Sequence, residues 1–306
     1  MNRAQFIEQA SKLVLAELQK IAEESRVRAE SRIPPEVQAQ FRTLDDVTVC
    51  EEKFVQTAWG KTHIYLIRKN VEEKEALPVV VNVHGGGWCL THTERDIYFC
   101  RRLANRTGCL IVDVDYVLAP EYPYPAALEE IEALLDQMPA LLKEWGGDPN
   151  RIILCGQSAG GNLIGAVSQR KRFTRKLGIR KQILCYLPAD NYTNRFGDAE
   201  LSPRDESTEY YGFFYNPVFE DRKNADVSLV FATSADLEGL PPTDIVTAGL
   251  DNLMPEAKQY YDLLVKADFP ASYHCFEQSR HGFLVNLYDE WQAGEDYIVS
   301  LVKKVL

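Results

Sequence analysis

The motif Gly156-Gln157-Ser158-Ala159-Gly160 is the strongest chemical signal in this chain. It directly follows the apolar run RIILC, which indicates a buried strand, and directly precedes a pattern typical of a helix. Glycines on both sides permit a tight turn that lifts the serine hydroxyl above the edge of a sheet, where the following helix directs its dipole. The context predicts that Ser158 is a nucleophile. A strand–helix turn that contains serine by chance is the alternative.

Three consecutive glycines follow another strand-like run. The segment His84-Gly85-Gly86-Gly87-Trp88 comes directly after PVVVNV. Because glycine has no side chain, its backbone N–H groups are open to close approach by a ligand. Such donors stabilise the oxyanion of a tetrahedral intermediate. The segment therefore predicts an oxyanion loop, and a flexible glycine turn is the alternative.

An aspartate and a histidine follow two later strand-like runs. Asp251 comes after DIVTA, and His281 comes after ASYHCF. In a parallel sheet both side chains lie at the carboxyl edge, where α/β proteins bind their ligands. The chain order serine, aspartate, histidine is also the order used by α/β-hydrolases. We therefore predict that Ser158 attacks a carbonyl, that His281 acts as general base, and that Asp251 orients the imidazole.

The other histidines are expected to be structural. The ring of His84 is expected to support the glycine loop through hydrogen bonds, and His274 lies inside a strand-like run. The sequence contains no HExxH motif, no Cys/His cluster and no glycine-rich nucleotide loop. We therefore expect neither a metal ion nor a cofactor.

Short apolar runs indicate the strands that must position these side chains. They cover residues 47–55, 63–67, 78–83, 109–115, 151–155, 182–187, 244–248 and 271–276. Helical patterns lie between the later runs, at residues 126–145, 160–172, 255–267 and 287–304. This alternation predicts an α/β fold with a mostly parallel sheet and helices on both of its faces. The first two runs are close in sequence and are expected to pair antiparallel.

Two regions do not follow the alternation. Residues 4–24 carry apolar side chains at helical spacing and predict one amphipathic helix, which ends at the proline-containing segment 32–35. Residues 191–235 are aromatic and predicted to be irregular, and a compact domain rarely keeps such a segment without a function. We expect residues 1–45 and an insertion at 191–235 to form a cap over the catalytic domain, residues 46–306. A surface insertion without a role is the alternative.

The two glycine motifs together resemble the hormone-sensitive-lipase family of α/β-hydrolases, the HGGG group of esterases. Further segments match that family in the same order. They are Tyr116-Val117-Leu118-Ala119-Pro120-Glu121, Tyr122-Pro123-Tyr124-Pro125-Ala126-Ala127, Gly239-Leu240-Pro241-Pro242, Asp251-Asn252-Leu253 and His281-Gly282-Phe283. The similarity spans residues 45–306 and implies an α/β-hydrolase fold, with an eight-stranded, mostly parallel sheet and a helical cap.

The resemblance also implies roles for individual residues. The N–H groups of Gly86, Gly87 and Ala159 would bind the oxyanion, supported by His84, Gly85, Gly156 and Gly160. The substrate would be an ester of short to medium acyl length, with water as the second reactant. An aromatic set either lines the pocket or packs the cap on the core: Trp88, Tyr210, Tyr211, Phe213, Phe214 and Tyr215.

Three positions depart from the family pattern. Gln157 stands where the serine motif usually has aspartate, and Val117 stands where the YRLAPE motif has arginine. Met254-Pro255-Glu256 follows the acid where R-D-E is usual. None of these is a triad residue, so we expect different supporting hydrogen bonds, one ion-pair partner fewer and a possible change in the orientation of the acid loop.

Composition narrows the setting. The net charge of −11 and the absence of a Lys/Arg cluster argue against nucleic-acid binding. We find no secretory signal or membrane-spanning stretch, and the odd number of cysteines, seven, favours reduced thiols. The sequence thus predicts a cytoplasmic protein, and either a monomer or a homodimer is compatible with the family.

Other functions fit the same residues. A deacetylase of sugar esters or an arylformamidase-type amide hydrolase would use the same triad. A small-molecule receptor on this fold is the non-enzyme alternative, but related receptors have lost the catalytic histidine, and His281 is present here.

Overall fold

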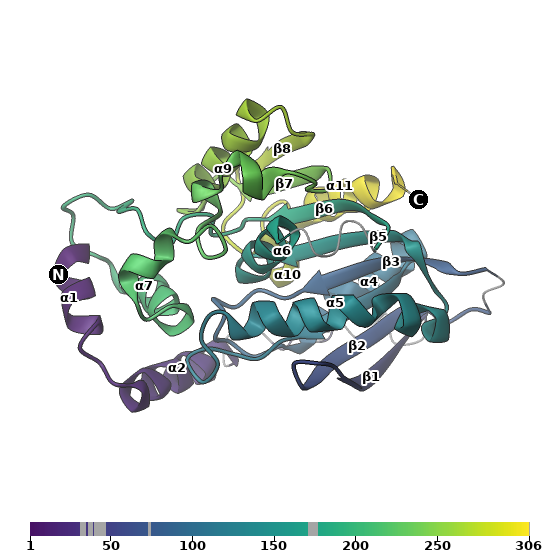
Figure 1. Ribbon diagram of the computed structural model, residues 1–306, viewed down its shortest axis with the longest axis horizontal. Coiled ribbons are helices and arrows are strands. Elements are labelled where there is room, and N and C mark those ends of the chain that lie inside the picture. The colour runs from purple at the N-terminus through teal and green to yellow at the C-terminus, as the bar shows by residue number, and fades with distance from the viewer. Residues whose placement is uncertain (31–34, 36–38, 40–46, 73–74, 171–176, 306) are drawn as a thin grey trace.

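A computed structural model of the chain describes residues 1–30, 35, 39, 47–72, 75–170 and 177–305. Eight strands of this described part form one sheet in the order β1-β2-β4-β3-β5-β6-β7-β8 (Figure 1). The strands are β1 (Thr48–Gln56), β2 (Lys61–Lys69), β3 (Leu77–Val83), β4 (Leu110–Asp115), β5 (Gly147–Gln157), β6 (Ile179–Cys185), β7 (Thr243–Ala248) and β8 (Ala271–Phe276). β2 is antiparallel to β1 and β4, and the other neighbouring pairs are parallel. The predicted sheet and its antiparallel first pair are confirmed.

Helices cover both faces of the sheet. They are α4 (Glu94–Thr107), α5 (Ala126–Trp145), α6 (Ala159–Gln169), α9 (Met254–Lys266), α10 (Phe283–Asn286) and α11 (Trp291–Lys303). Val79 and Val81 of β3 pack in one apolar cluster with α5, α6 and α9, whereas Val80 packs in another with α4 and α11. Because both faces of β3 meet apolar partners, its sequence is a continuous apolar run rather than an alternating one.

Two helices differ from the sequence prediction. The apolar pattern does not indicate α4, whose exposed face is strongly charged. This helix begins with a capping interaction, in which the Thr93 N–H donates to Asp96 Oδ2 (2.9 Å). The last helix begins at Trp291 rather than at residue 287. Leu287 and Asp289 adopt left-handed backbone conformations (φ 57° and 55°), which interrupt a helix.

The single N-terminal helix predicted over residues 4–24 is wrong. Two helices occupy this region, α1 (Arg3–Ala10) and α2 (Leu15–Glu30). The Asn2 side chain caps α1, and the Glu17 carboxylate accepts the N–H of Val14 (2.9 Å) to begin α2. Most of the segment 32–35 and the boundary at residue 45 lie outside the described residues.

The region 191–235 is also more regular than predicted. It contains α7 (Pro203–Tyr215), two 3-10 turns, η2 (Phe219–Lys223) and η3 (Leu229–Phe231), and α8 (Ser234–Leu237). The Ser202 side chain accepts the N–H of Asp205 (3.2 Å), and proline at the first helical position favours a helix start. The local capping signals thus outweigh the aromatic and polar composition of this stretch.

The helices α1, α2 and α7 lie together beside the sheet, although α7 is far from the other two in sequence (Figure 1). Arg3 of α1 pairs with Glu209 of α7 (2.8 Å), and both side chains are buried. Phe6 packs against Phe213, while Leu18 and Ala22 of α2 share an apolar cluster with Phe214. We call these helices the three-helix layer.

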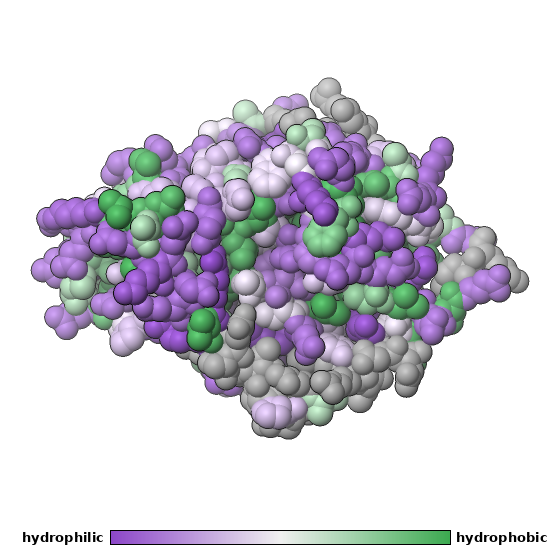
Figure 2. Space-filling view, turned by 90° about the horizontal axis from the view of Figure 1, so that it is seen from below, coloured by the Kyte–Doolittle hydropathy of each residue, from purple (hydrophilic) through white to green (hydrophobic). Residues whose placement is uncertain are grey.

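The surface is mostly polar on the face that is visible in Figure 2. The face shown in Figure 2 is mainly hydrophilic, and its apolar side chains appear in small, separated groups. Scattered apolar groups are normal on a folded protein. In the described part of the chain, no helix combines the length and apolar character needed to cross a membrane.

Candidate active site

Ser158 occupies a strained turn between β5 and α6. Its backbone has φ 52° and ψ −121°, a conformation that non-glycine residues rarely adopt. A Cβ on Gly160 would lie 2.0 Å from the carbonyl oxygen of Val83, and one on Gly156 would lie 2.3 Å from the carbonyl oxygen of Gly160. Both glycines are therefore required for the turn to pack against β3, and strain of this kind typically marks a functional site.

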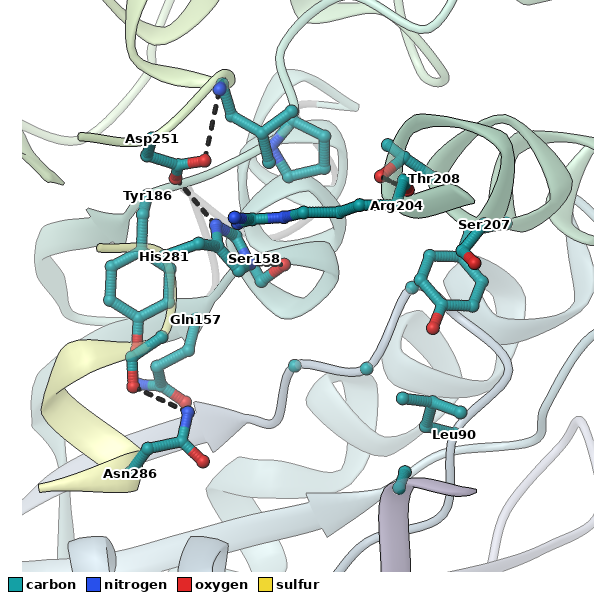
Figure 3. Close-up of a pocket in the computed structure, with 18 of the residues that line it drawn as sticks. Leu90, Gln157, Ser158, Tyr186, Arg204, Ser207, Thr208, Asp251, His281 and Asn286 are labelled. Atoms are coloured by element: carbon teal, nitrogen blue, oxygen red, sulfur yellow. Dashed lines mark hydrogen bonds and ion pairs between the residues drawn. The ribbon is translucent and has the colours of Figure 1, made fainter. Parts of the chain in front are cut away.

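The structure brings Ser158, His281 and Asp251 together in one hydrogen-bonded chain (Figure 3). The Ser158 Oγ lies 2.9 Å from His281 Nε2, and His281 Nδ1 lies 2.6 Å from Asp251 Oδ2. With Nδ1–H donating to the carboxylate, Nε2 is free to accept the serine proton. The other carboxylate oxygen of Asp251 accepts the N–H of Leu253 (3.2 Å). This geometry suits proton transfer from the hydroxyl to the imidazole.

The loops that carry Asp251 and His281 are bonded to each other. The N–H of Leu250 donates to the carbonyl of Ser279 (2.9 Å), and the N–H of Gly249 donates to that of Phe276 (2.8 Å). The Tyr288 hydroxyl donates to the carbonyl of His281. The aspartate and the histidine are thus positioned by one connected loop pair beyond β7 and β8.

The glycine loop lies directly against the serine. A Cβ on Gly85 would be 3.3 Å from Ser158 Cβ, and Gly86 and Gly87 have φ values of +126° and +58°. The carbonyl of Gly86 accepts the N–H groups of Cys89 (3.1 Å) and Leu90 (2.8 Å), which fixes the turn. Among the described residues, no backbone bond outside regular helices and strands uses the N–H of Gly86, Gly87 or Ala159.

His84 lies beneath this loop. Its Nδ1 donates to the carbonyl of Gly85 (2.6 Å), and its ring stacks on Tyr116 with centroids 4.4 Å apart. Complete burial lowers the pKa of His84, so the ring is neutral. The ring therefore makes the kind of supporting hydrogen bond that the sequence led us to expect.

A polar chain connects the serine turn to strands β3 and β4. Gln157 Nε2 donates to Asn82 Oδ1 (2.9 Å), and Asn82 Nδ2 donates to Asp113 Oδ1 (2.7 Å). The other oxygen of Asp113 lies 2.8 Å from His92 Nε2. Burial lowers the pKa of His92, but the Asp113 carboxylate outweighs this and raises it to about 9. Gln157 thus has a defined partner, and the ion pair His92–Asp113 is a feature that sequence reasoning missed.

The signal for that ion pair is present in the sequence. Asp113 interrupts the apolar run LIVDV, and a carboxylate inside a buried strand requires a partner. The partner lies twenty-one residues away, and spacing of that kind identifies no motif. Three-dimensional proximity alone reveals it.

The other two departures from the family pattern are also accommodated. Glu130 accepts the N–H of Val117 (2.7 Å), no arginine pairs with it among the described residues, and burial raises its pKa to about 7. Glu256 accepts the N–H of Ala189 (2.9 Å) and pairs with Arg195. The segment after the acid therefore anchors the start of α9 without displacing Asp251 from His281.

A cleft of about 1070 Å³ opens over Ser158. Its walls come from α2, the glycine loop, α7 and the loops that hold Asp251 and His281. Side chains that sequence reasoning did not single out take part, among them Leu90, Tyr186, Arg204, Ser207, Thr208 and Asn286 (Figure 3). They belong to no motif. Leu90 lies in the loop after β3 and Tyr186 directly follows β6, whereas the positions of the other four depend on how α7 and α10 pack.

The predicted aromatic lining is correct only in part. Trp88 and Tyr211 contribute to the cleft, whereas four of the six candidates do not: Tyr210, Phe213, Phe214 and Tyr215. Tyr210 packs edge-on against Phe6 (centroids 4.7 Å apart), and Tyr215 stacks on Trp88 (4.6 Å). One face of α7 meets the cleft and the others meet α1, α2 and the core, so helical periodicity separates neighbours in sequence.

The described residues contain no group of three or more His, Cys, Asp or Glu side chains arranged to hold a metal ion.

Comparisons with known proteins agree with this geometry. A family profile described as alpha/beta hydrolase fold matches residues 80–285, which include the glycine loop, Ser158, Asp251 and His281. Carboxylesterase NlhH of Mycobacterium tuberculosis is 33% identical over 218 residues, covering 69% of this chain and 68% of that protein. Arylesterase of Saccharolobus solfataricus is 31% identical over 220 residues, covering 67% and 68%. A solved hyperthermophilic esterase from Pyrobaculum calidifontis has a TM-score of 0.79 at 25% identity, covering 99% of this chain and 97% of that one.

Proposed function

This chain belongs to the hormone-sensitive-lipase (HGGG) family of α/β-hydrolase fold esterases, and we propose that it cleaves short- to medium-chain carboxylic esters with Ser158, His281 and Asp251. The reaction passes through an acyl-enzyme on Ser158. The observation that carries the proposal is the hydrogen-bonded chain from Ser158 Oγ to His281 (2.9 Å) and on to Asp251 (2.6 Å). Its position at the floor of a cleft gives a substrate access to the serine.

Acylation follows from this arrangement. The Ser158 hydroxyl gives its proton to His281 Nε2 as the oxygen attacks the ester carbonyl, and Asp251 stabilises the imidazolium that forms. The oxyanion lies among the N–H groups of Gly86, Gly87 and Ala159. The ester C–O bond then breaks, and the alcohol leaves with the proton from His281. Water, deprotonated by the same imidazole, releases the acid and restores the serine.

The three-helix layer supports a role as a cap. It contributes Ser25, Ala29 and Tyr211 to the cleft wall, so a long acyl chain must pass it. We therefore propose that residues 1–45 and the insertion 191–235 cap the catalytic domain 46–306 and limit acyl length. Turnover of p-nitrophenyl esters from acetate to palmitate should fall sharply beyond medium chains.

The decisive test replaces the nucleophile. Ser158→Ala should reduce turnover of p-nitrophenyl butyrate by about 10⁶-fold, because the covalent step is lost. Ser168→Ala, a buried serine on the same helix but outside the cleft, is the matched control and should retain activity. Circular dichroism should show both variants folded. Turnover retained in folded Ser158→Ala would falsify the nucleophile assignment.

Rival substrates can be separated directly. The same triad would hydrolyse acetylated sugars or aryl formamides, so these are compared with p-nitrophenyl esters at equal concentration. We expect the highest kcat/KM for the esters. The receptor alternative predicts no covalent reaction, whereas the esterase should react with a fluorophosphonate at Ser158 and lose that label in Ser158→Ala.

A further inference from the structure

The wall of the cleft is rich in arginine. The charged side chains in its described wall are Arg28, Arg95, Arg195, Arg204, Arg280, Asp96, Asp205 and Asp251. A guanidinium that no carboxylate neutralises would favour an anionic ligand in such a wall.

Each of the three aspartates of the cleft either accepts hydrogen bonds from neutral groups or pairs with His281. Asp96 accepts the N–H and hydroxyl of Thr93, and Asp251 pairs with His281. Asp205 accepts the hydroxyl of Ser202 (2.6 Å) and the side-chain amide of Asn252 (3.2 Å). Within the part of the chain that the structure describes, none of these carboxylates forms an ion pair with an arginine of the cleft.

Two of the arginines are neutralised from outside the cleft. Arg195 pairs with Glu256, and Arg280 pairs with Asp289 (3.0 Å). Arg204 differs from both, because its guanidinium has neither an ion pair nor a side-chain hydrogen bond within the part of the chain that the structure describes.

Arg95 is a second guanidinium without a carboxylate in the described structure. It donates from Nη1 to the amide oxygen of Asn286, a neutral group, and its Nε is buried without a partner. An unsatisfied buried donor in a cleft wall is costly unless a ligand or water meets it. Arg95 thus adds positive potential on the α4 side of the same cleft.

Arg204 lies where it can meet a substrate at the triad. It occupies the second position of α7, and its side chain extends from α7 toward His281 (Figure 3). Burial raises the pKa of Tyr288, and the charges of Arg280 and Arg204 oppose that rise. The guanidinium of Arg204 is therefore within electrostatic reach of the tyrosine whose hydroxyl donates to the His281 carbonyl.

On the basis of the proposed esterase function, we propose that the preferred substrates are esters that also carry a free carboxylate, and that Arg204 binds this carboxylate. A guanidinium offers two parallel N–H donors that match a carboxylate. Hydrolysis of such an ester consumes one water and breaks the ester C–O bond. It releases an alcohol and a dicarboxylate when the free carboxylate is on the acyl side, and a carboxylate and a hydroxy acid when it is on the alcohol side. The carboxylate bound by Arg204 is not consumed and serves only to position the ester carbonyl over Ser158.

The test compares charged and neutral esters of matched size. One pair is mono-p-nitrophenyl glutarate and p-nitrophenyl pentanoate, with the charge on the acyl side. The other is 4-acetoxybenzoate and its methyl ester, with the charge on the alcohol side. The native protein should prefer the charged member of one pair, and the preferred pair shows on which side the carboxylate lies.

Variants assign the preference to Arg204. In Arg204→Gln the ratio of kcat/KM for the charged ester to that for the neutral ester should fall roughly 10- to 100-fold, and Arg204→Lys should restore part of it. Arg180→Gln is the matched control, because Arg180 is an exposed arginine at the amino end of β6, outside the cleft. The proposal is overturned if the native protein prefers the neutral ester in both pairs, or if Arg204→Gln leaves the ratio unchanged.

A binding measurement separates this proposal from the proposed function. Calorimetry with Ser158→Ala and the charged esters needs no turnover, so it reports on the carboxylate site alone. We expect measurable binding that weakens about 10-fold or more in Ser158→Ala/Arg204→Gln. Equal binding of charged and neutral esters contradicts the carboxylate site even if catalysis by Ser158 holds, while turnover by Ser158→Ala contradicts the triad and leaves the binding result intact.

Discussion

The serine turn with its glycine loop and the three-helix layer face each other across one cleft, but they are built in different ways. The first depends on backbone geometry, with positive φ at Ser158, Gly86 and Gly87 and no space for a Cβ on Gly160. The second depends on side chains, such as the Arg3–Glu209 pair, and presents Arg204 to the cleft. We therefore expect few residue types to fit the serine turn and its glycine loop, and many to fit the three-helix layer.

The largest effect is expected at Asp251, which we propose orients the imidazole of His281. Asp251→Asn should lower kcat/KM for p-nitrophenyl butyrate by about 10⁴-fold, because an amide stabilises neither the correct tautomer nor the imidazolium. Asp205→Asn, on α7 and also in the cleft wall, should lower it far less. Similar losses of kcat/KM in Asp251→Asn and Asp205→Asn would contradict the distinction between the triad and the three-helix layer.

The next effect concerns how the three-helix layer is attached. Phe6 is buried between Tyr210 and Phe213, and Phe6→Ala should cost about 3–5 kcal/mol of packing free energy. We expect amide hydrogen exchange to quicken in α1 and α7 much more than in β3 and β5, because side-chain contacts hold the layer. Phe54→Ala, at an exposed phenylalanine on β1, is the control. An equal change throughout the chain would show that layer and sheet unfold as one unit.

The difference between the two sides also explains what the sequence reveals. The serine motif, the glycine loop and the positions of Asp251 and His281 follow from local patterns, because the turn geometry permits few residue types. The strands were recognisable since a buried parallel strand such as β3 must be apolar on both faces. Family membership and fold class, inferred from these motifs, are confirmed.

What the sequence did not reveal has two causes. The break between α1 and α2 and the start of α7 depend on capping bonds made by single side chains, which an apolar pattern does not show. The contact between Tyr210 and Phe6 depends on packing between distant segments. The pair His92–Asp113 joins residues that no motif connects. Apolar and aromatic side chains are interchangeable in such contacts to a degree that the residues of the serine turn are not.

A smaller effect should appear where the two sides touch. Gly87 has φ +58°, and a Cβ there would lie 2.5 Å from Cγ of Tyr211 on α7. Gly87→Ala should shift the loop and lower kcat for p-nitrophenyl butyrate about 10²-fold, because misplaced donors stabilise the oxyanion less. The double variant Gly87→Ala/Tyr211→Ala should recover part of the loss, since it removes the clash.

The control for this substitution separates backbone strain from the clash. Gly108 also has positive φ (+76°), but nothing lies within 4 Å of an added Cβ. Gly108→Ala should therefore reduce stability slightly and leave kcat unaltered. If the double variant recovers no activity, contact between the glycine loop and α7 does not explain the defect.

The smallest effect is a pH dependence of stability that we expect Glu130 on α5 to cause. Burial raises the pKa of Glu130 from its ordinary 4.5 to about 7, and its carboxyl accepts the N–H of Val117, which stands where the family pattern has arginine. The folded state therefore holds a proton that the unfolded state has lost between these pH values. Glu130 makes the free energy of unfolding fall as pH rises through this window.

Glu130→Gln should remove this dependence. Relative to the native protein, the variant should gain about 3 kcal/mol of unfolding free energy between pH 4 and pH 8, measured by urea denaturation at each pH. Glu129→Gln, at the exposed neighbouring position on α5, should leave the pH profile unaltered. If the unfolding free energy of Glu130→Gln and of the native protein changes with pH in the same way, another group in the folded state compensates for the arginine that the family pattern has at position 117. The side of the cleft that holds the serine turn would then tolerate sequence change as readily as the three-helix layer does.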